Sequence, residues 1–229
     1  MLRLDDVVLG FEDFTLSVYL SVPKGARLAI LGPSGGGKTT LLSTIAGFLR
    51  PDTGRVILDG QDVTDWPVQD RPLSILFQEG NLFPHLTAFN NVALGVNPSL
   101  KLTEKEREAV AGSLDKVGLG GMGVRKPGDL SGGQRSRVAL ARMLLRRKPL
   151  ALLDEPFAAL DPGLRREMLA LVGDLCEAEG LTLVMVSHDL RDAERLCTDL
   201  CLLEEGTVIL NGSLEPMLGE PPEALRPWL

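Results

Sequence analysis

The chain has 229 residues, of which 44% are apolar, and this is enough for one large α/β domain or two small ones. Its formal net charge of −7 argues against bulk nucleic-acid binding as the main activity. No apolar run reaches about 18 residues, so a role at a membrane would require a separate partner. Three cysteines without metal-ligand spacing predict reduced core thiols in a cytosolic protein: Cys176, Cys197 and Cys201.

Two segments at the start of the chain, residues 2–9 and 14–22, alternate apolar and polar residues. This pattern predicts a pair of antiparallel strands. Phe11 lies in the short turn between them. Its ring either anchors that turn or, if a nucleotide binds nearby, stacks on the base.

A glycine-rich segment follows the apolar run 27–31 and precedes a helical pattern at 41–46. Strand, glycine-rich turn and helix are the context in which G-x-x-x-x-G-K-[ST] forms a phosphate-binding loop, whose backbone N–H groups approach an anion. We expect Lys38 to reach the β- and γ-phosphates and the Thr39 hydroxyl to bind Mg²⁺. The alternative is a glycine-rich turn with an incidental lysine. The predicted loop comprises Gly32, Pro33, Ser34, Gly35, Gly36, Gly37, Lys38, Thr39 and Thr40.

Short strands are predicted at 55–58 and 71–77, and Gln78 follows the second strand. A polar residue there occupies the place where open α/β sheets bind ligands, although it can equally be an ordinary strand-end residue. From 79 to about 149 the strand patterns disappear. A helix is predicted at 87–94, and a capping box at Thr103–Glu106 begins another. This part therefore resembles a helical insertion into an α/β sheet.

The insertion ends with a basic run and a glycine pair. The run is either a solvated helix face or a binding patch, and comprises Arg135, Arg137, Arg142, Arg146, Arg147 and Lys148. Ser131 and Gln134 fit a capping box that begins a helix. Gly132 and Gly133 between them are poor helix formers, and they would expose backbone N–H groups as a second anion site.

Polar residues follow two further apolar strands. Asp154 and Glu155 end the strand 150–153, where an Asp would hold Mg²⁺ and the next carboxylate would polarise water; the alternative is a solvated loop pair. Asp161 is predicted to cap a helix that ends near residue 179. His188 follows the strand 181–187 and is either structural or functional. Two short strands, 200–203 and 206–210, precede a proline-rich helical tail.

In this order, the motifs resemble the ATP-binding-cassette (ABC) ATPase family over essentially the whole chain. The phosphate loop at 32–39, Leu-Ser-Gly-Gly-Gln at 130–134 and Ala-Leu-Asp at 159–161 stand as in the family. Gln78, Asp154 with Glu155, and His188 match its other motifs, and Phe11 stands where an aromatic, usually Tyr, stacks on adenine. Lys-Thr-Thr replaces the commoner Lys-Ser-Thr, and either hydroxyl can bind Mg²⁺.

The resemblance implies an α/β fold: a P-loop NTPase core with a mixed, largely parallel sheet, an N-terminal antiparallel β-subdomain and an inserted α-helical subdomain. The single domain would span 1–229, with about 1–78 and 150–229 in the RecA-like core and about 79–149 helical. The implied catalytic residues are Glu155 as general base, His188 and Gln78. The implied Mg²⁺ ligands are Thr39, Gln78 and Asp154.

The resemblance also implies partners. A head-to-tail homodimer would bind ATP between Lys38 of one chain and the signature of the other, with Ser131, Gly132, Gly133, Gln134 and Asp161 as further nucleotide-binding residues. A membrane permease would dock near residues 78–85 on the cytoplasmic face of the inner membrane, and a periplasmic or extracellular solute-binding protein would act indirectly.

Within the family, the segments 76–87 and 94–102 resemble the ATP-binding subunits of thiamine importers. We therefore expect an ATPase that drives uptake of thiamine or its phosphates. An importer for another small solute such as ferric iron is the alternative. A soluble ABC ATPase that acts on DNA or ribosomes is more remote, since the chain lacks a long coiled-coil insertion and a second cassette. A nucleotide-binding module without turnover would not need Glu155.

Overall fold

The computed structural model describes residues 1–77 and 81–229, which fall into two compact units. Unit 1 comprises Met1–Leu73, Pro149–Glu155 and Val172–Leu229. Unit 2 comprises Ser74–Lys148 and Pro156–Leu171. Gln78, which we expected to be catalytic, lies outside the described residues.

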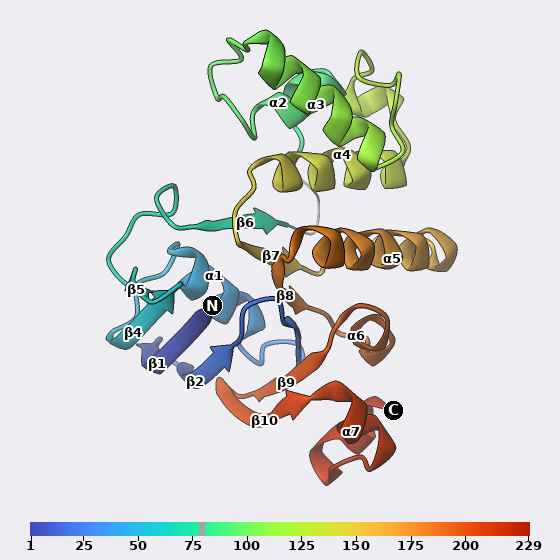
Figure 1. The fold of residues 1–229 in the computed structure, drawn as a ribbon. Coiled ribbons are helices and arrows are strands. Elements are labelled where there is room, and N and C mark those ends of the chain that lie inside the picture. Colours follow the sequence, from blue (N-terminus) through green and yellow to red (C-terminus); the bar gives the residue numbers. More distant parts are fainter. Residues whose placement is uncertain (78–80) are drawn as a thin grey trace. The chain divides into compact units, whose positions relative to one another are not determined.

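Most strands belong to unit 1. Figure 1 labels them along the chain. The strands are β1 (Leu2–Gly10), β2 (Thr15–Val22), β3 (Arg27–Leu31), β4 (Thr53–Leu58), β5 (Gln61–Asp62), β6 (Leu73–Leu76), β7 (Leu150–Asp154), β8 (Thr182–Val186), β9 (Asp199–Glu204) and β10 (Thr207–Ser213).

The helices lie in both units, and α5 contributes residues to each. The α-helices are α1 (Lys38–Ala46), α2 (Ala88–Ala93), α3 (Glu104–Lys116), α4 (Gly132–Leu145), α5 (Pro162–Glu179), α6 (Leu190–Leu196) and α7 (Leu214–Gly219), and the 3₁₀ helices are η1 (Pro127–Asp129) and η2 (Glu223–Trp228).

The sheet of unit 1 is mixed, as expected. Its strands follow the order β5-β4-β1-β2-β10-β9-β3-β8-β7. β1 pairs antiparallel with β2 and β4, which confirms the predicted antiparallel pair at the start of the chain. β3 runs parallel to β8 and β9, and β7 runs parallel to β8. The carboxyl ends of β3, β8 and β7 therefore lie side by side at the same end of the sheet.

The burial patterns explain these strand positions. Every second residue of β2 is buried, which is the alternation of a strand with one face in the core. All five residues of β8 are buried, as expected for a central parallel strand with both faces covered. Cys176, Cys197 and Cys201 are buried and unpaired with one another, as predicted.

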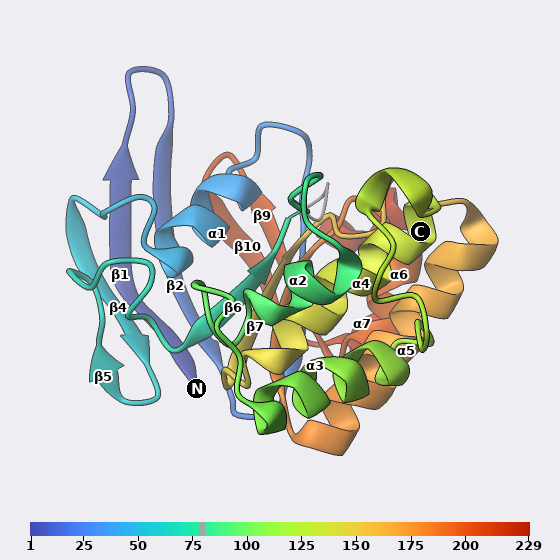
Figure 2. The ribbon, with the colours of Figure 1, turned by 90° about the horizontal axis from the view of Figure 1, so that it is seen from above.

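In unit 2, helices α2, α3 and α4 pack against one another, and the views in Figures 1 and 2 agree on this. The predicted capping box of α3 is present: Thr103 Oγ1 accepts from Glu106 N at 3.3 Å, and Glu106 Oε2 accepts from Thr103 N at 2.7 Å. The buried Ser113 hydroxyl of α3 donates to Ala141 O of α4 at 3.0 Å. The packing of α3 on α4 therefore includes a satisfied polar contact.

Two predicted elements are shorter in the structure. The strand expected at 71–77 is β6, which begins only at Leu73, because Pro72 has no N–H to donate to a ladder. The helix expected at 87–94 is α2, which begins at Ala88 because Thr87 is its N-cap and accepts from Asn90 N.

Candidate functional site

The predicted phosphate loop connects β3 to α1 within unit 1. Gly35 and Gly37 have φ angles of +79° and +98°, a region that L side chains adopt only with strain. A Cβ atom on Gly32 would lie 2.0 Å from the carbonyl oxygen of Leu203 in β9. The glycines therefore serve two purposes: they permit the turn, and they let the loop approach a neighbouring strand.

Lys38, the first residue of α1, is buried and bonds to its own loop. Its Nζ donates to the carbonyl oxygens of Gly32 and Pro33, each at 2.8 Å. Burial lowers the pKa of Lys38, while the charges of Glu155 and Asp154 raise it. The ammonium is thus held at the loop, within electrostatic range of the two acids that end β7.

The hydroxyl groups of the loop differ in exposure. Ser34 and Thr39 are exposed and Thr40 is half-buried. An exposed hydroxyl at the start of a helix is available to a metal ion or a phosphate. The assignment of Thr39 to Mg²⁺ stays a prediction.

Asp154 and Glu155 lie where β7 ends beside β8. Asp154 is opposite Val186 in the ladder, and Glu155 N donates to Val186 O at 3.1 Å. Glu155 has a φ of +42°, in the left-handed region that costs a non-glycine residue about 1–2 kcal/mol. Burial raises the pKa of Asp154, the charge of Glu155 raises it further, and Lys38 lowers it. A strained backbone and a disfavoured carboxylate at one point are typical of a functional site.

The structure brings Glu155 and His188 together. His188 Nδ1 lies 3.4 Å from Glu155 Oε2, and the side chain of His188 is 55% exposed. The pair combines the carboxylate of Glu155 and the imidazole of His188 at the strand ends beside Lys38. This arrangement can orient water beside a phosphate. The functional role of His188 stays a prediction.

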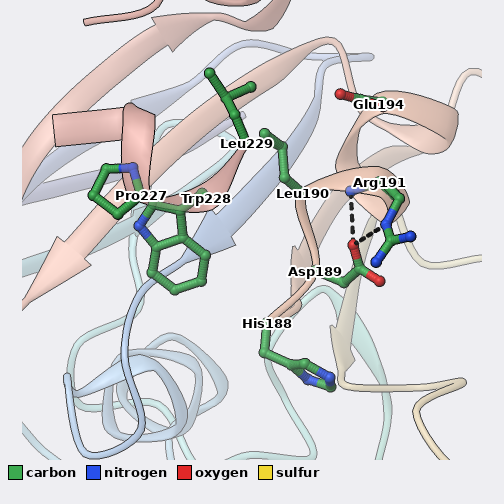
Figure 3. A pocket seen from close by; sticks show the side chains of 8 residues that line it. All are labelled: His188, Asp189, Leu190, Arg191, Glu194, Pro227, Trp228 and Leu229. Atoms are coloured by element: carbon green, nitrogen blue, oxygen red, sulfur yellow. Dashed lines mark hydrogen bonds and ion pairs between the residues drawn. The ribbon is translucent and has the colours of Figure 1, made fainter. Parts of the chain in front are cut away.

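His188 also borders a cavity of about 660 Å³ (Figure 3). The wall opposite α6 consists of Pro227, Trp228 and Leu229 at the end of the chain. Asp189, the N-cap of α6, accepts from the backbone N–H and the Nε of Arg191, as the dashed lines show.

Phe11 lies in the turn between β1 and β2, with its ring 48% exposed. Its N–H donates to Phe14 O at 2.7 Å, and the two ring centroids are 6.2 Å apart. Phe14 in turn approaches the phosphate loop, since a Cβ on Gly37 would lie 2.7 Å from its Cζ. Phe11 is thus exposed near the loop and contacts Phe14, and both base stacking and the anchor role stay predictions.

In unit 2, Ser131 caps α4 as predicted. Its hydroxyl accepts from Gln134 N at 3.3 Å, and Gln134 Oε1 accepts from Ser131 N at 3.0 Å. A Cβ on Gly133 would lie 2.1 Å from Leu164 Cδ2, so this glycine lets α4 approach α5. A Cβ on Gly132 would meet nothing closer than 3.8 Å. Packing accounts for Gly133 but not for Gly132, and the anion site stays a prediction.

Asp161 caps α5, as predicted from the sequence. Its Oδ1 accepts from Gly163 N at 3.1 Å and from Leu164 N at 3.0 Å. Pro162 occupies the first helical position, where its missing N–H costs nothing.

The basic run of α4 is engaged within unit 2. Arg135 and Arg137 donate to backbone carbonyls at 2.8 Å each, and Arg142 donates to Asn81 O at 3.0 Å. Arg137 also forms an ion pair with Glu167 at 2.6 Å. Three of the six basic residues therefore bond within unit 2, while Arg146, Arg147 and Lys148 follow the end of α4 at Leu145, and both the solvated face and the binding patch stay predictions.

Comparison with known proteins places this geometry in a family. The family model described as "ABC transporter" matches residues 16–158. The thiamine import ATP-binding protein ThiQ of Jannaschia sp. (strain CCS1) is 59% identical over all 229 residues and over 100% of its own length. The ThiQ protein of Shigella flexneri is 46% identical over 228 residues, which are 100% of this chain and 98% of the relative.

The chain belongs to the ABC transporter family.

Solved structures agree with this assignment. The ABC cassette MJ0796, as a post-hydrolysis dimer bound to ADP and Pi, is 31% identical, with a TM-score of 0.79 over 93% of this chain and 99% of that one. The cbiO1 protein of Clostridium perfringens, part of the cbiONQ ABC transporter complex, is 27% identical, with a TM-score of 0.86 over 99% and 93%. The α/β fold expected from the motifs is that of an ABC cassette, and the cassette binds ATP.

Mg²⁺ fits the donors of this ABC cassette only in part. No group of three or more His, Cys, Asp or Glu side chains able to hold a metal occurs among residues 1–77 and 81–229. Mg²⁺ at nucleotide sites is commonly held by one or two carboxylates together with substrate phosphates and water. Asp154 and Thr39 suit such a shared site, which would be completed by the nucleotide.

The sequence did not predict the role of Arg71 in the cassette. Its side chain is 1% exposed, and Nη1 donates to Thr44 O at 2.8 Å and Ile45 O at 2.7 Å, at the end of α1. Gly47 ends α1 with a φ of +91°, and a Cβ there would lie 2.6 Å from Arg71 Nε. Arg71 therefore caps the helix whose first turn carries Lys38. The only sequence signal was the lack of a basic residue in the last turn of α1.

None of the helices in the described part of the cassette is long and apolar enough to cross a bilayer.

Proposed function

We propose that this chain is the ATP-hydrolysing subunit of an importer for thiamine or thiamine phosphates. The hydrolytic part is carried by one observation: Glu155 and His188 meet at 3.4 Å, at the sheet edge that also carries Lys38. The solute is supported by full-length likeness to thiamine import ATP-binding proteins. On this proposal, residues 1–229 form one cassette with a core at about 1–78 and 150–229 and a helical part at about 79–149.

The residues of unit 1 divide the work on the nucleotide. Phe11 stacks on adenine, the backbone N–H groups of residues 32–40 surround the phosphates, and Lys38 exchanges its two loop carbonyls for phosphate oxygens. Glu155 accepts a proton from the attacking water as the water oxygen bonds to the γ-phosphorus, and the bond to the bridging β–γ oxygen breaks to release ADP. His188 orients the same water and contacts the γ-phosphate. Thr39, Asp154 and Gln78 would hold Mg²⁺, which would neutralise phosphate charge.

The residues of unit 2 are proposed to act on the ATP of a second copy. Ser131 and Gly133 face the γ-phosphate held by the partner in a head-to-tail homodimer, and Gly132, Gln134 and Asp161 are further nucleotide-binding residues. The dimer of the MJ0796 cassette supports this arrangement. ATP that bridges two half-sites favours the closed dimer, and hydrolysis removes the bridging charge.

A permease is proposed to dock near residues 78–85, which places the cassette at the cytoplasmic face of the inner membrane. A solute-binding protein on the far side acts through that permease. The names of the relatives, thiamine import ATP-binding proteins, support a role in import, which requires a separate membrane component.

Two substitutions test the hydrolytic part. Lys38→Ala is expected to abolish ATP binding, whereas Lys24→Ala, at an exposed lysine, serves as the control. Glu155→Gln is expected to bind ATP, to form an ATP-bound dimer and to lose turnover. Micromolar binding by Lys38→Ala would remove the loop assignment, and normal hydrolysis by Glu155→Gln would remove the general base.

The solute is tested by purifying the chain with its native permease and measuring ATP turnover in vesicles with a loaded binding protein. Stimulation by thiamine, and not by ferric iron, is expected. Stimulation by another solute would retain the importer and reject thiamine. Absence of any membrane partner would favour a soluble ABC ATPase.

A further inference from the structure

The turn that carries His188 is attached to a buried carboxylate that the proposed mechanism does not use. Asp192 lies in the first turn of α6 and is only 6% exposed. Its Oδ2 accepts from the hydroxyl of Ser187 at 3.0 Å, and Ser187 is itself 2% exposed. A carboxylate is rarely buried to this degree without a specific partner. The Ser187–Asp192 hydrogen bond is therefore a specific contact that satisfies the buried carboxylate.

Ser187 connects this carboxylate to both sides of His188. Its N–H donates to Ile30 O of β3 at 3.2 Å, two residues before the phosphate loop. Its hydroxyl oxygen accepts from Asp189 N at 3.1 Å. Ser187 and Asp189, on either side of His188, are thus hydrogen-bonded to one another. Figure 3 shows His188 and Asp189 of this turn.

The direction of the Ser187 hydroxyl depends on Asp192. The hydroxyl has one proton, and two acceptors lie within reach: Asp192 Oδ2 at 3.0 Å and Asp189 O at 3.4 Å. A carboxylate is the stronger and here the nearer acceptor, so the proton points to Asp192. This leaves the oxygen lone pairs free for Asp189 N. Without Asp192, the hydroxyl loses the acceptor that fixes its direction, and the turn loses its hydrogen bond to α6.

We propose that Asp192 is a positioning residue for hydrolysis: through Ser187 it fixes the turn that aims His188 at Glu155. This inference rests on the proposed ATPase function. The side chain of His188 is 55% exposed, and its Nδ1 lies 3.4 Å from Glu155 Oε2, so close packing is not what orients it. The orientation of the imidazole depends on the backbone of residues 187–189, and Asp192 holds that backbone through its hydrogen bond with Ser187.

Four variants test the proposal. Asp192→Leu removes the acceptor, Ser187→Ala removes the hydroxyl, and Asp192→Asn keeps an acceptor at the same place. Glu194→Gln is the matched control, because Glu194 is exposed on the same helix and lines the same cavity as His188. For each variant, the thermal midpoint, ATP affinity, KM and single-turnover hydrolysis are measured on the full chain.

We expect Asp192→Leu and Ser187→Ala each to lower kcat by about tenfold to a hundredfold, the usual cost of small misplacement, with ATP affinity and KM unchanged. Asp192→Asn is expected to retain most of the rate, and Glu194→Gln all of it. The double variant Asp192→Leu/Ser187→Ala should be no slower than the slower single variant, since both changes remove the same Ser187–Asp192 hydrogen bond. Wild-type rates in Asp192→Leu and Ser187→Ala would overturn the proposal, as would losses that multiply in the double variant.

A spectroscopic measurement distinguishes a change in the orientation of His188 from a loss of protein stability. The chain has two histidines, His85 and His188, so ring resonances in a proton–nitrogen spectrum are readily assigned. The His188 resonance should move or broaden in Ser187→Ala while that of His85 stays. An unchanged His188 resonance would refute the positioning role.

If Asp192→Leu fails to fold, Ser187→Ala and Asp192→Asn decide the question by the same measurements. Lack of hydrolysis by the wild type would refute the ATPase function itself, which is distinct from failure of the positioning role.

Discussion

The contact between Gly133 and Leu164 gives a quantitative prediction for Gly133→Ala. The new methyl would lie 2.1 Å from Leu164 Cδ2 and 3.0 Å from both Cγ and Cδ1, where carbon atoms normally lie about 3.5–4.0 Å apart. Because Cγ is included, rotation of one methyl does not relieve the overlap, and the whole side chain must move. Overpacking of this kind costs about 1–3 kcal/mol, and the higher helix propensity of alanine returns about 1 kcal/mol.

Because the methyl overlaps three atoms of Leu164, the overpacking cost lies in the upper part of that range, about 2–3 kcal/mol, so we expect Gly133→Ala to lower the free energy of unfolding by about 1–2 kcal/mol. Gly132→Ala is the matched control, because its methyl meets nothing closer than 3.8 Å and it should be neutral or slightly stabilising. Urea unfolding followed by circular dichroism measures both. Leu164→Ala combined with Gly133→Ala should be more stable than the sum of the single effects predicts. Equal stability of Gly133→Ala and wild type, or equal loss in Gly132→Ala, would refute the packing argument.

Three further predictions concern a cap, the thiols and the aromatic ring. Asp161→Ala should cost about 1 kcal/mol in urea unfolding and Asp161→Asn much less, because only alanine fails to cap α5; equal losses would contradict the cap. Burial raises the pKa of Cys176 from 9.0 to about 11 and that of Cys201 to about 12. Above pH 9 the unfolded thiols lose protons that the folded thiols keep, so stability falls as pH rises, by about 1.4 kcal/mol per thiol at pH 10. Urea midpoints at pH 8 and 10 should differ less when both cysteines are alanine, and an unchanged difference would exclude this linkage. Phe11→Ala should weaken ATP binding in a titration by about 1 kcal/mol, and Phe11→Tyr should restore it; no loss would return Phe11 to the anchor role.

Motifs whose residues all lie within a few positions of one another were predictable from the sequence. The capping boxes at Thr103–Glu106 and Ser131–Gln134 consist of residues three apart, so they need no tertiary information. The same holds for the apolar runs that form β3, β7 and β8, because each is bounded by polar residues and follows a turn.

Contacts that depend on two distant segments were not predictable. Arg71 caps a helix that ends 25 residues earlier in the chain, at Ala46. The packing role of Gly133 was not predicted, because its sequence position shows only a helix start, while its close contact with Leu164 is a property of how α4 meets α5. The contact between Ser187 and Asp192 was not predicted, because the sequence indicated only that His188 follows an apolar strand.

The parallel ladder of β3, β8 and β7 has a consequence for how this chain can diverge. Val186 of β8 is paired with Ile30 on one side and Asp154 on the other, so the phosphate loop, the acidic pair and His188 begin at neighbouring rungs. The spacing between them is set by backbone hydrogen bonds, about 4.8 Å per strand, and not by which apolar side chains fill the core. Leucine, valine and isoleucine can therefore exchange in these strands over evolutionary time while the site keeps its dimensions. A single inserted or deleted residue there would shift a whole rung and separate the acid from the phosphate.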